Sequence, residues 1–295
     1  MSKPVIFVIC ATGNIGSATL QALSTKYAGK FDIRAGVRNP DKADKLRGLA
    51  GVTVVQASQG DKDNLVGVFK GVDALYIIAP GAENRAELVI ATAEAAKAAG
   101  VKFLLVLSVL TADPTDTIFG RQLNETERAV TKLNIPHAFL RLPLFVENYW
   151  AFKDPIQSQS SIYSPVDPSQ PFTSVVVDDA GKAAAAVLAD WRKHENKTYT
   201  IISDRHSYGD VAKEFSEAVG KEVKYVRVPY DAAKQSFLQA GVPEWQTDGI
   251  LELYKLIDAG SPATNYADLG DFEKITGEKP TNLKAWLSKV GGAFK

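Results

Sequence analysis

The chain has 295 residues, of which 45% are hydrophobic and 23% charged, and this predicts a globular fold rather than a disordered or repetitive chain. Its 34 basic and 34 acidic side chains cancel, so no overall charge would attract nucleic acid or an anionic membrane surface. The lone cysteine, Cys10, cannot form an internal disulfide, and the sequence has neither a signal-peptide pattern nor an apolar run long enough to cross a membrane. We therefore expect a cytoplasmic protein that binds neither nucleic acid nor membranes.

Short β-branched runs alternate with helical patterns through the first half of the chain. The expected strands are Val5–Ile9, Ile33–Val37, Val52–Gln56, Ala74–Ala79, Lys102–Ser108 and His137–Leu142. Helices are expected from Asn14, from about Asp61, from Glu83 to a stop at Gly100, and near Arg121–Leu133. This alternation predicts an α/β fold built on a doubly wound parallel sheet of the Rossmann type.

The regular alternation ends after Trp150. A Ser-rich segment with several prolines follows, and amphipathic helical patterns return at 230–240 and 245–258. We expect residues 1–150 to form a dinucleotide-binding domain and residues 151–295 to form mainly a smaller α/β lobe on the substrate side. Residues 173–202 are expected to return to the Rossmann domain.

A glycine-containing loop follows the first expected strand and leads into a helix. It reads Cys10-Ala11-Thr12-Gly13-Asn14-Ile15-Gly16. Glycine lets the backbone approach a pyrophosphate, and the free N–H groups of a helix N-terminus favour phosphate. We expect Thr12 through Gly16 to bind a dinucleotide. Cys10 stands where the first glycine of the pattern is expected, so its β-carbon must fit the turn.

The end of the second expected strand selects between NAD and NADP. A carboxylate there would bind the ribose hydroxyls and repel a 2′-phosphate, but this chain has Arg38, whose guanidinium can pair with a phosphate. Lys42 could add a second positive charge or form part of a solvated surface. Asp32 lies at the opposite end of the strand. The sequence therefore predicts NADP(H) as the cofactor.

Further ligands are expected where other strands end, because such sheets bind ligands at their carboxyl edge. Ala57 and Ser58 end the third expected strand and could line the adenine. Ala79-Pro80-Gly81 ends the fourth and could pass along the ribose and nicotinamide. Position in the chain is the support for these assignments, and ordinary loop roles are the alternative.

Several motifs resemble the NmrA-like branch of the atypical short-chain dehydrogenase/reductases. The carrying segments are 11–16, 37–43, 98–103, Asn124-Glu125-Thr126-Glu127, Arg141-Leu142-Pro143, 145–149, and the closing Thr276-Gly277, Pro280 and Trp286. Within that branch the chain is similar to NADPH-dependent quinone oxidoreductases of the bacterial type and to an NmrA-like redox sensor. The resemblance implies that Leu144–Asn148 wall the nicotinamide pocket. Phe145 and Asn148 are then expected beside the cofactor, with Phe145, Tyr149 and Trp150 forming a flat apolar substrate surface.

The usual catalytic groups of the wider superfamily are missing. Its Tyr-x-x-x-Lys pair is absent from the helix after the fifth expected strand, and the Tyr149/Lys153 match falls elsewhere in the chain. Ser108 occupies the place of the superfamily serine and is the candidate catalytic residue. The three histidines lack metal-ligand spacing, so we expect no metal.

Two functions remain open from sequence. The first is NADPH-dependent reduction of a quinone or similar conjugated carbonyl, because a quinone gains aromaticity on reduction and can take its proton from water. The second is a non-catalytic NADP(H) sensor that regulates a protein partner. A small aromatic substrate is expected for the enzyme, and the sequence leaves homodimer formation open.

Overall fold

The computed structural model describes residues 2–295, and its centre is a seven-stranded sheet in which all neighbouring strands are parallel. In spatial order the strands are β10 (Lys197–Thr200), β6 (His137–Leu142), β5 (Phe103–Val109), β4 (Ala74–Ile77), β1 (Val5–Ile9), β2 (Asp32–Val37) and β3 (Val52–Gln56). The predicted α/β, doubly wound fold is confirmed, and β10 extends the six expected strands at the edge next to β6.

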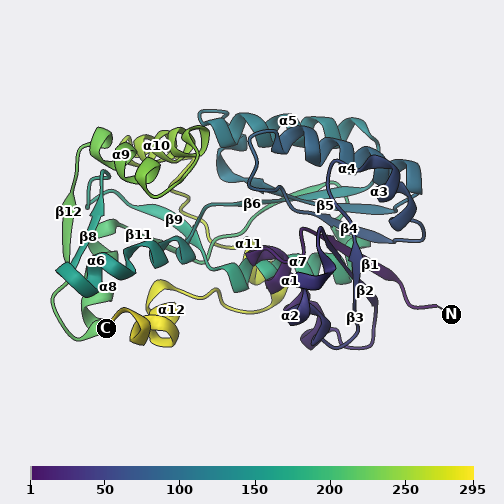
Figure 1. Ribbon diagram of the computed structural model, residues 1–295, viewed down its shortest axis with the longest axis horizontal. Helices are drawn as coiled ribbons and strands as arrows, with labels where there is room; N and C mark the ends of the chain where they lie inside the picture. Colours follow the sequence, from purple (N-terminus) through teal and green to yellow (C-terminus); the bar gives the residue numbers. More distant parts are fainter. Residues whose placement is uncertain (1) are drawn as a thin grey trace.

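Helices cover both faces of this sheet (Figure 1). On one face lie α1 (Asn14–Lys26), α2 (Asp44–Arg47), α7 (Val177–Ala189) and α11 (Asp271–Thr276), and on the other α3 (Lys62–Val68), α4 (Arg85–Ala99) and α5 (Ile118–Lys132). Small residues let α1 and α7 approach closely, since a β-carbon on Gly181 would lie 2.6 Å from the Ala18 side chain. Two separate apolar cores fill the two sides of the sheet.

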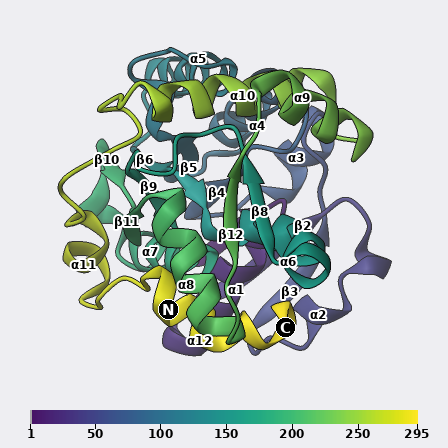
Figure 2. The ribbon, with the colours of Figure 1, turned by 90° about the vertical axis from the view of Figure 1, so that its left-hand side faces the viewer.

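The remaining elements form a lobe at one end of the sheet, on the left of Figure 1 and facing the viewer in Figure 2. Its strands are β7 (Leu144–Phe145), β9 (Phe172–Val175) and β11 (Asp204–His206) in one small sheet, and β8 (Ser161–Ser164) with β12 (Lys224–Arg227) in another. Its helices are α6 (Lys153–Gln159), α8 (Tyr208–Val219), α9 (Tyr230–Gln239), α10 (Glu244–Asp258) and α12 (Leu283–Val290). A third apolar core belongs to this lobe.

The chain passes between the two parts more than once. The expected boundary near residue 150 falls within the 3-10 helix η3 (Val146–Phe152), and β7 already pairs with β9 before it. Of the segment 173–202, α7 packs on α1 and β10 joins the large sheet, whereas β9 lies in the small one. No helix within residues 2–295 combines the length and apolar character that a membrane crossing requires.

Candidate active site

A cavity of about 1320 Å³ lies between the large sheet and the lobe. It opens at the carboxyl ends of β1 and β4, the neighbouring strands at which the strand order reverses. Open α/β sheets bind ligands at this position. The lining includes most of the residues that the sequence singles out: Thr12, Gly13, Asn14, Ile15, Arg38, Ala57, Ser58, Ala79, Pro80, Gly81, Ser108, Phe145, Asn148 and Tyr149.

The loop after β1 forms a compact turn. Cys10 has a φ of 58°, a left-handed conformation that glycine adopts more easily, and its carbonyl accepts a hydrogen bond of 3.1 Å from the Gly13 N–H. Helix α1 then begins at Asn14 with no side chain capping its N-terminus. Its first N–H groups therefore have no partner within the helix and can bind an anion.

Two glycines keep this turn tight. A β-carbon on Gly16 would lie 2.6 Å from the Cys10 carbonyl oxygen and 2.8 Å from the Ala11 Cα, and one on Gly13 would lie 3.3 Å from the same oxygen. Gly16 is buried under the loop and does not line the cavity, so its place in the fold is close packing of α1 against the loop. This compact backbone cradle at an uncapped helix N-terminus fits the pyrophosphate of a dinucleotide.

Arg38 follows β2 and lines the same cavity. Within residues 2–295 it has no ion-pair partner, whereas Arg34 at the other end of the strand bonds Asp32 at 3.1 Å. Asp32 therefore lies away from the cavity, as its place in the sequence indicates. Lys42 lies in the exposed 3-10 helix η1 (Pro40–Lys42), outside the cavity lining. The structure brings Arg38, but not Lys42, to the glycine loop.

Ser108 lies at the cavity wall, but its hydroxyl is already bonded. It donates a hydrogen bond of 2.5 Å to Glu127 Oε1, and Arg141 donates to both oxygens of that carboxylate at 2.9 and 2.6 Å. The ion pair and hydrogen bond with Glu127 raise the pKa of Arg141. Ser108 thus belongs to a buried network with Glu127 and Arg141, and its proton is not free for a substrate carbonyl.

Two aromatic residues expected in the substrate surface have different surroundings. Tyr149 lines the cavity, yet its hydroxyl is hydrogen-bonded to His206 Nε2 at 2.7 Å and burial raises its pKa. Trp150 is 40% exposed, stacks on Phe294 with ring centroids 4.7 Å apart, and lies outside the cavity lining. The structure thus places Trp150 against the C-terminal segment rather than in the cavity wall.

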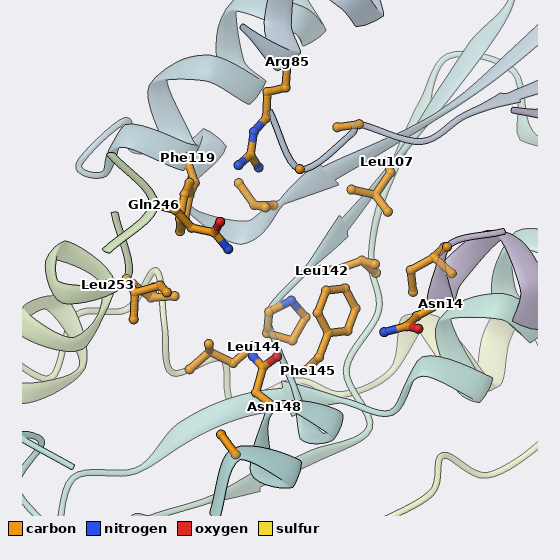
Figure 3. A pocket seen from close by; sticks show the side chains of 18 of the residues that line it. Asn14, Arg85, Leu107, Phe119, Leu142, Leu144, Phe145, Asn148, Gln246 and Leu253 are labelled. Atoms are coloured by element: carbon orange, nitrogen blue, oxygen red, sulfur yellow. The ribbon is translucent and has the colours of Figure 1, made fainter. Parts of the chain in front are cut away.

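Sequence reasoning missed the residues that close the cavity on the far side from the glycine loop. Figure 3 shows Asn14 on one side, Leu142 and Phe145 in the middle, and Arg85, Phe119 and Gln246 across from Asn14. Further unpredicted lining residues are Gln59, Ala232, Phe237 and Leu253. Helices α9 and α10 contribute several of these from more than 140 residues beyond β4 in the chain, and no local motif marks them.

The Cys10 thiol gives a prediction of its own. Burial raises its pKa to about 11, although Arg38 opposes the rise. The thiolate is the reactive form, so at pH 8 ionisation alone makes Cys10 about 200-fold less reactive than a cysteine of ordinary pKa. We expect slow labelling by a thiol-specific disulfide reagent that accelerates about tenfold per pH unit up to about pH 11.

The chain has one cysteine, so the labelling signal has a single source. The same protein unfolded in urea is the control and should label at the rate of a free thiol. Rapid labelling of the folded protein at pH 8, with no change in its circular dichroism, would contradict the buried environment assigned to Cys10.

Comparison with known proteins identifies relatives over the full length of the chain. The model of the NmrA-like family matches residues 2–288. An NAD(P)H azoreductase of Xenophilus azovorans is 28% identical, with 98% of each chain covered. The structure of an NADPH-dependent quinone oxidoreductase of Escherichia coli in complex with NADPH is 29% identical, with a TM-score of 0.82 over 97% of this chain and 99% of that one.

A third relative has a different named substrate. The triphenylmethane reductase of Citrobacter sp., crystallised with NADP(H), is 28% identical, with a TM-score of 0.84 over 97% of this chain and 99% of that one. These relatives agree with the family resemblance and the cofactor that the sequence predicts. The matched family model spans nearly the whole chain, and the protein therefore belongs to the NmrA-like family.

Proposed function

We propose that this protein is an NADPH-dependent oxidoreductase that reduces quinones or similar conjugated acceptors by hydride transfer. One observation carries the proposal: a single cavity of about 1320 Å³ joins the glycine loop to an apolar and aromatic surface around Phe145. Its volume exceeds the roughly 300–1,000 Å³ of common ligand pockets, so it has room for a dinucleotide and a flat substrate. A redox sensor needs room for the dinucleotide but not for a substrate.

The chain's own residues would bind and orient the two reactants. The uncapped N-terminus of α1 would hold the pyrophosphate, and Arg38 would pair with the 2′-phosphate. Phe145 and Asn148 would lie beside the nicotinamide, as the family resemblance implies, with Ala57, Ser58 and Ala79–Gly81 along the rest of the cofactor. The chemistry that NADPH supplies when bound is donation of a hydride.

The proposed substrate class is supported by the surroundings of two hydroxyl groups in the cavity lining, those of Ser108 and Tyr149. The Ser108 hydroxyl donates its proton to Glu127, and the Tyr149 hydroxyl is hydrogen-bonded to His206 Nε2, so both hydroxyls already have a partner within the protein. A quinone accepts a hydride and then one proton from water, giving an aromatic hydroquinone and NADP⁺. Such an acceptor needs no acid from the protein, unlike a simple ketone. We also propose a cytoplasmic location for this reaction, in keeping with the absence of disulfides.

The direct test follows the loss of NADPH absorbance with a panel of quinones and azo dyes. We expect turnover with a preference for NADPH over NADH, and none in buffer without protein. Tight NADPH binding without turnover of any acceptor would contradict the enzyme and favour a redox sensor with a protein partner.

A second prediction separates a structural from a catalytic role for Ser108. In Ser108→Ala, the buried Glu127 carboxylate loses one donor but keeps Arg141, so the free energy of unfolding should fall by about 1–3 kcal/mol. The kcat for quinone reduction should fall less than about tenfold, below the roughly 100-fold expected for a general acid. Urea denaturation and steady-state kinetics measure the two effects.

Ser174→Ala is the matched control, since the buried Ser174 hydroxyl has no hydrogen-bond partner among residues 2–295. Its removal should leave the free energy of unfolding unchanged or slightly higher. A large loss of kcat in Ser108→Ala with unchanged stability would instead identify Ser108 as a catalytic residue.

A further inference from the structure

Arg85 is one of the two charged residues that line the described part of the cavity. It is the first residue of α4, and Figure 3 shows its side chain directed toward the space beside Phe119 and Gln246. Its Nε donates to the Ala82 carbonyl at 3.3 Å, and no carboxylate in residues 2–295 lies within ion-pair distance of it. We propose that Arg85, assisted by Gln246, binds a negatively charged substituent, such as a carboxylate or sulfonate, on the aromatic acceptor. This inference rests on the proposed function and specifies its substrate class.

Two aromatic rings fix the guanidinium in place. Its central carbon lies 5.0 Å from the Phe119 ring centroid and 4.8 Å from that of Trp245, and the two rings meet edge to face at 6.1 Å. Cation–π contact holds a guanidinium through its charge and leaves N–H groups that can still donate to an anion. A positioned fork of donors suits a carboxylate or sulfonate, which accepts two parallel hydrogen bonds.

The charged residues that line the cavity also favour an anionic ligand. Among residues 2–295, Arg38 and Arg85 are the charged residues of its lining, to which no aspartate, glutamate, lysine or histidine of this range contributes. Arg38 adjoins the glycine loop and is assigned to the cofactor, whereas Arg85 stacks on residues of α5 and α10 at the lobe side. Burial lowers the pKa of Arg85, which shows that its charge is partly desolvated without compensation. An anionic ligand would supply that compensation.

A carboxylate on a neighbouring helix, Glu252, has other partners. Glu252 of α10 accepts from the Ile118 N–H at 2.5 Å and from Arg121 at 3.5 Å, so it caps α5 rather than neutralising Arg85. Gln246 of the same helix lines the cavity and carries an amide that can donate to an anion. Leu144 and Leu253 supply apolar surface nearby. The subsite thus matches an aromatic body with an anionic group at one edge.

The decisive experiment compares two unreactive ligands of the same shape, naphthoate and its neutral amide, naphthamide. Calorimetric titration of protein saturated with NADP⁺ gives both dissociation constants. We expect naphthoate to bind about tenfold more tightly than naphthamide, and Arg85→Met to abolish that preference. Arg85→Lys should restore part of it, because lysine keeps the charge but not the fork. The matched control is Arg192→Met, since Arg192 is stacked on Trp191 at 4.3 Å outside the cavity lining.

Kinetics provide an independent readout. The ratio of kcat/KM for naphthoquinone sulfonate to that for naphthoquinone should fall about tenfold in Arg85→Met and about threefold in Gln246→Leu. Equal affinity of the wild-type protein for naphthoate and naphthamide would overturn the proposal. So would a loss of NADPH affinity in Arg85→Met as large as the loss of naphthoate affinity, which would place Arg85 in the cofactor site.

The outcomes also separate this inference from the proposed function. Turnover of neutral quinones together with equal binding of naphthoate and naphthamide would refute the anion subsite alone. A preference for naphthoate that disappears in Arg85→Met, in a protein that reduces no acceptor, would support the subsite and refute the reductase. Circular dichroism of each variant shows whether it folds, and Arg85→Lys keeps the test decisive if Arg85→Met does not.

Discussion

Replacing Arg38 with aspartate is expected to weaken NADPH binding about 100-fold while weakening NADH binding less than about threefold. A charge-assisted pair between guanidinium and phosphate contributes about 1.5–3 kcal/mol, and a carboxylate in its place adds repulsion of the 2′-phosphate. A total near 3 kcal/mol corresponds to roughly two powers of ten in the dissociation constant. NADH lacks that phosphate, so titration with each cofactor measures the difference directly.

Lys42→Asp is the matched control for this change. Like Arg38→Asp, it replaces a positive side chain with a negative one, at a position four residues further along the chain. Lys42, however, is exposed and lies outside the cavity lining. Screened by solvent and salt, its effect on NADPH should stay within about threefold. Equal losses of NADPH and NADH affinity in Arg38→Asp would contradict the contact between Arg38 and the 2′-phosphate. A large loss of NADPH affinity in Lys42→Asp would identify Lys42 as a cofactor ligand.

The part of the candidate site around the glycine loop could be predicted to lie together because its determinants are local. Strand β1, the loop at 10–13 and the start of α1 are contiguous, and Arg38 lies a fixed distance along the same βαβ unit. At Cys10 the sequence predicts only that a β-carbon must fit the turn, and the structure adds that this residue adopts a left-handed conformation. Short-range geometry alone places these residues.

The substrate half depends on contacts that no local pattern encodes. Arg85 meets Trp245 across 160 residues, and α10 lies against α5 because Gly249 leaves room for the Phe119 ring, 2.7 Å from a β-carbon placed there. Nor does the sequence reveal that Glu127, 19 residues from Ser108, binds the serine hydroxyl. Such contacts arise from tertiary packing, whereas the hydrophobic periodicity of a sequence predicts only its secondary structure.

Gly16→Ala is expected to lower the free energy of unfolding by about 1–3 kcal/mol, the usual cost of overpacking, and to weaken NADPH binding about 100-fold. The new β-carbon would lie 2.6 Å from the Cys10 carbonyl oxygen and 2.8 Å from the Ala11 Cα. Both are backbone atoms, so the loop itself must move away from the α1 N-terminus. Loss of two charge-assisted hydrogen bonds to the pyrophosphate, near 3 kcal/mol in total, gives the predicted fall in affinity.

Alanine variants of two further glycines test whether the loss depends on how closely the added β-carbon approaches other atoms. Gly13→Ala brings a β-carbon to 3.3 Å of the same oxygen, so a shift of a few tenths of an ångström relieves it and the losses should be smaller. Gly67 in α3 has no atom within 4 Å of such a carbon, and Gly67→Ala should raise the free energy of unfolding by about 0.5–1 kcal/mol. Urea denaturation and NADPH titration of all three variants test the order. Wild-type NADPH affinity in Gly16→Ala would mean that the path of this loop does not control the cofactor, and the assignment of the cradle to the pyrophosphate would then fail.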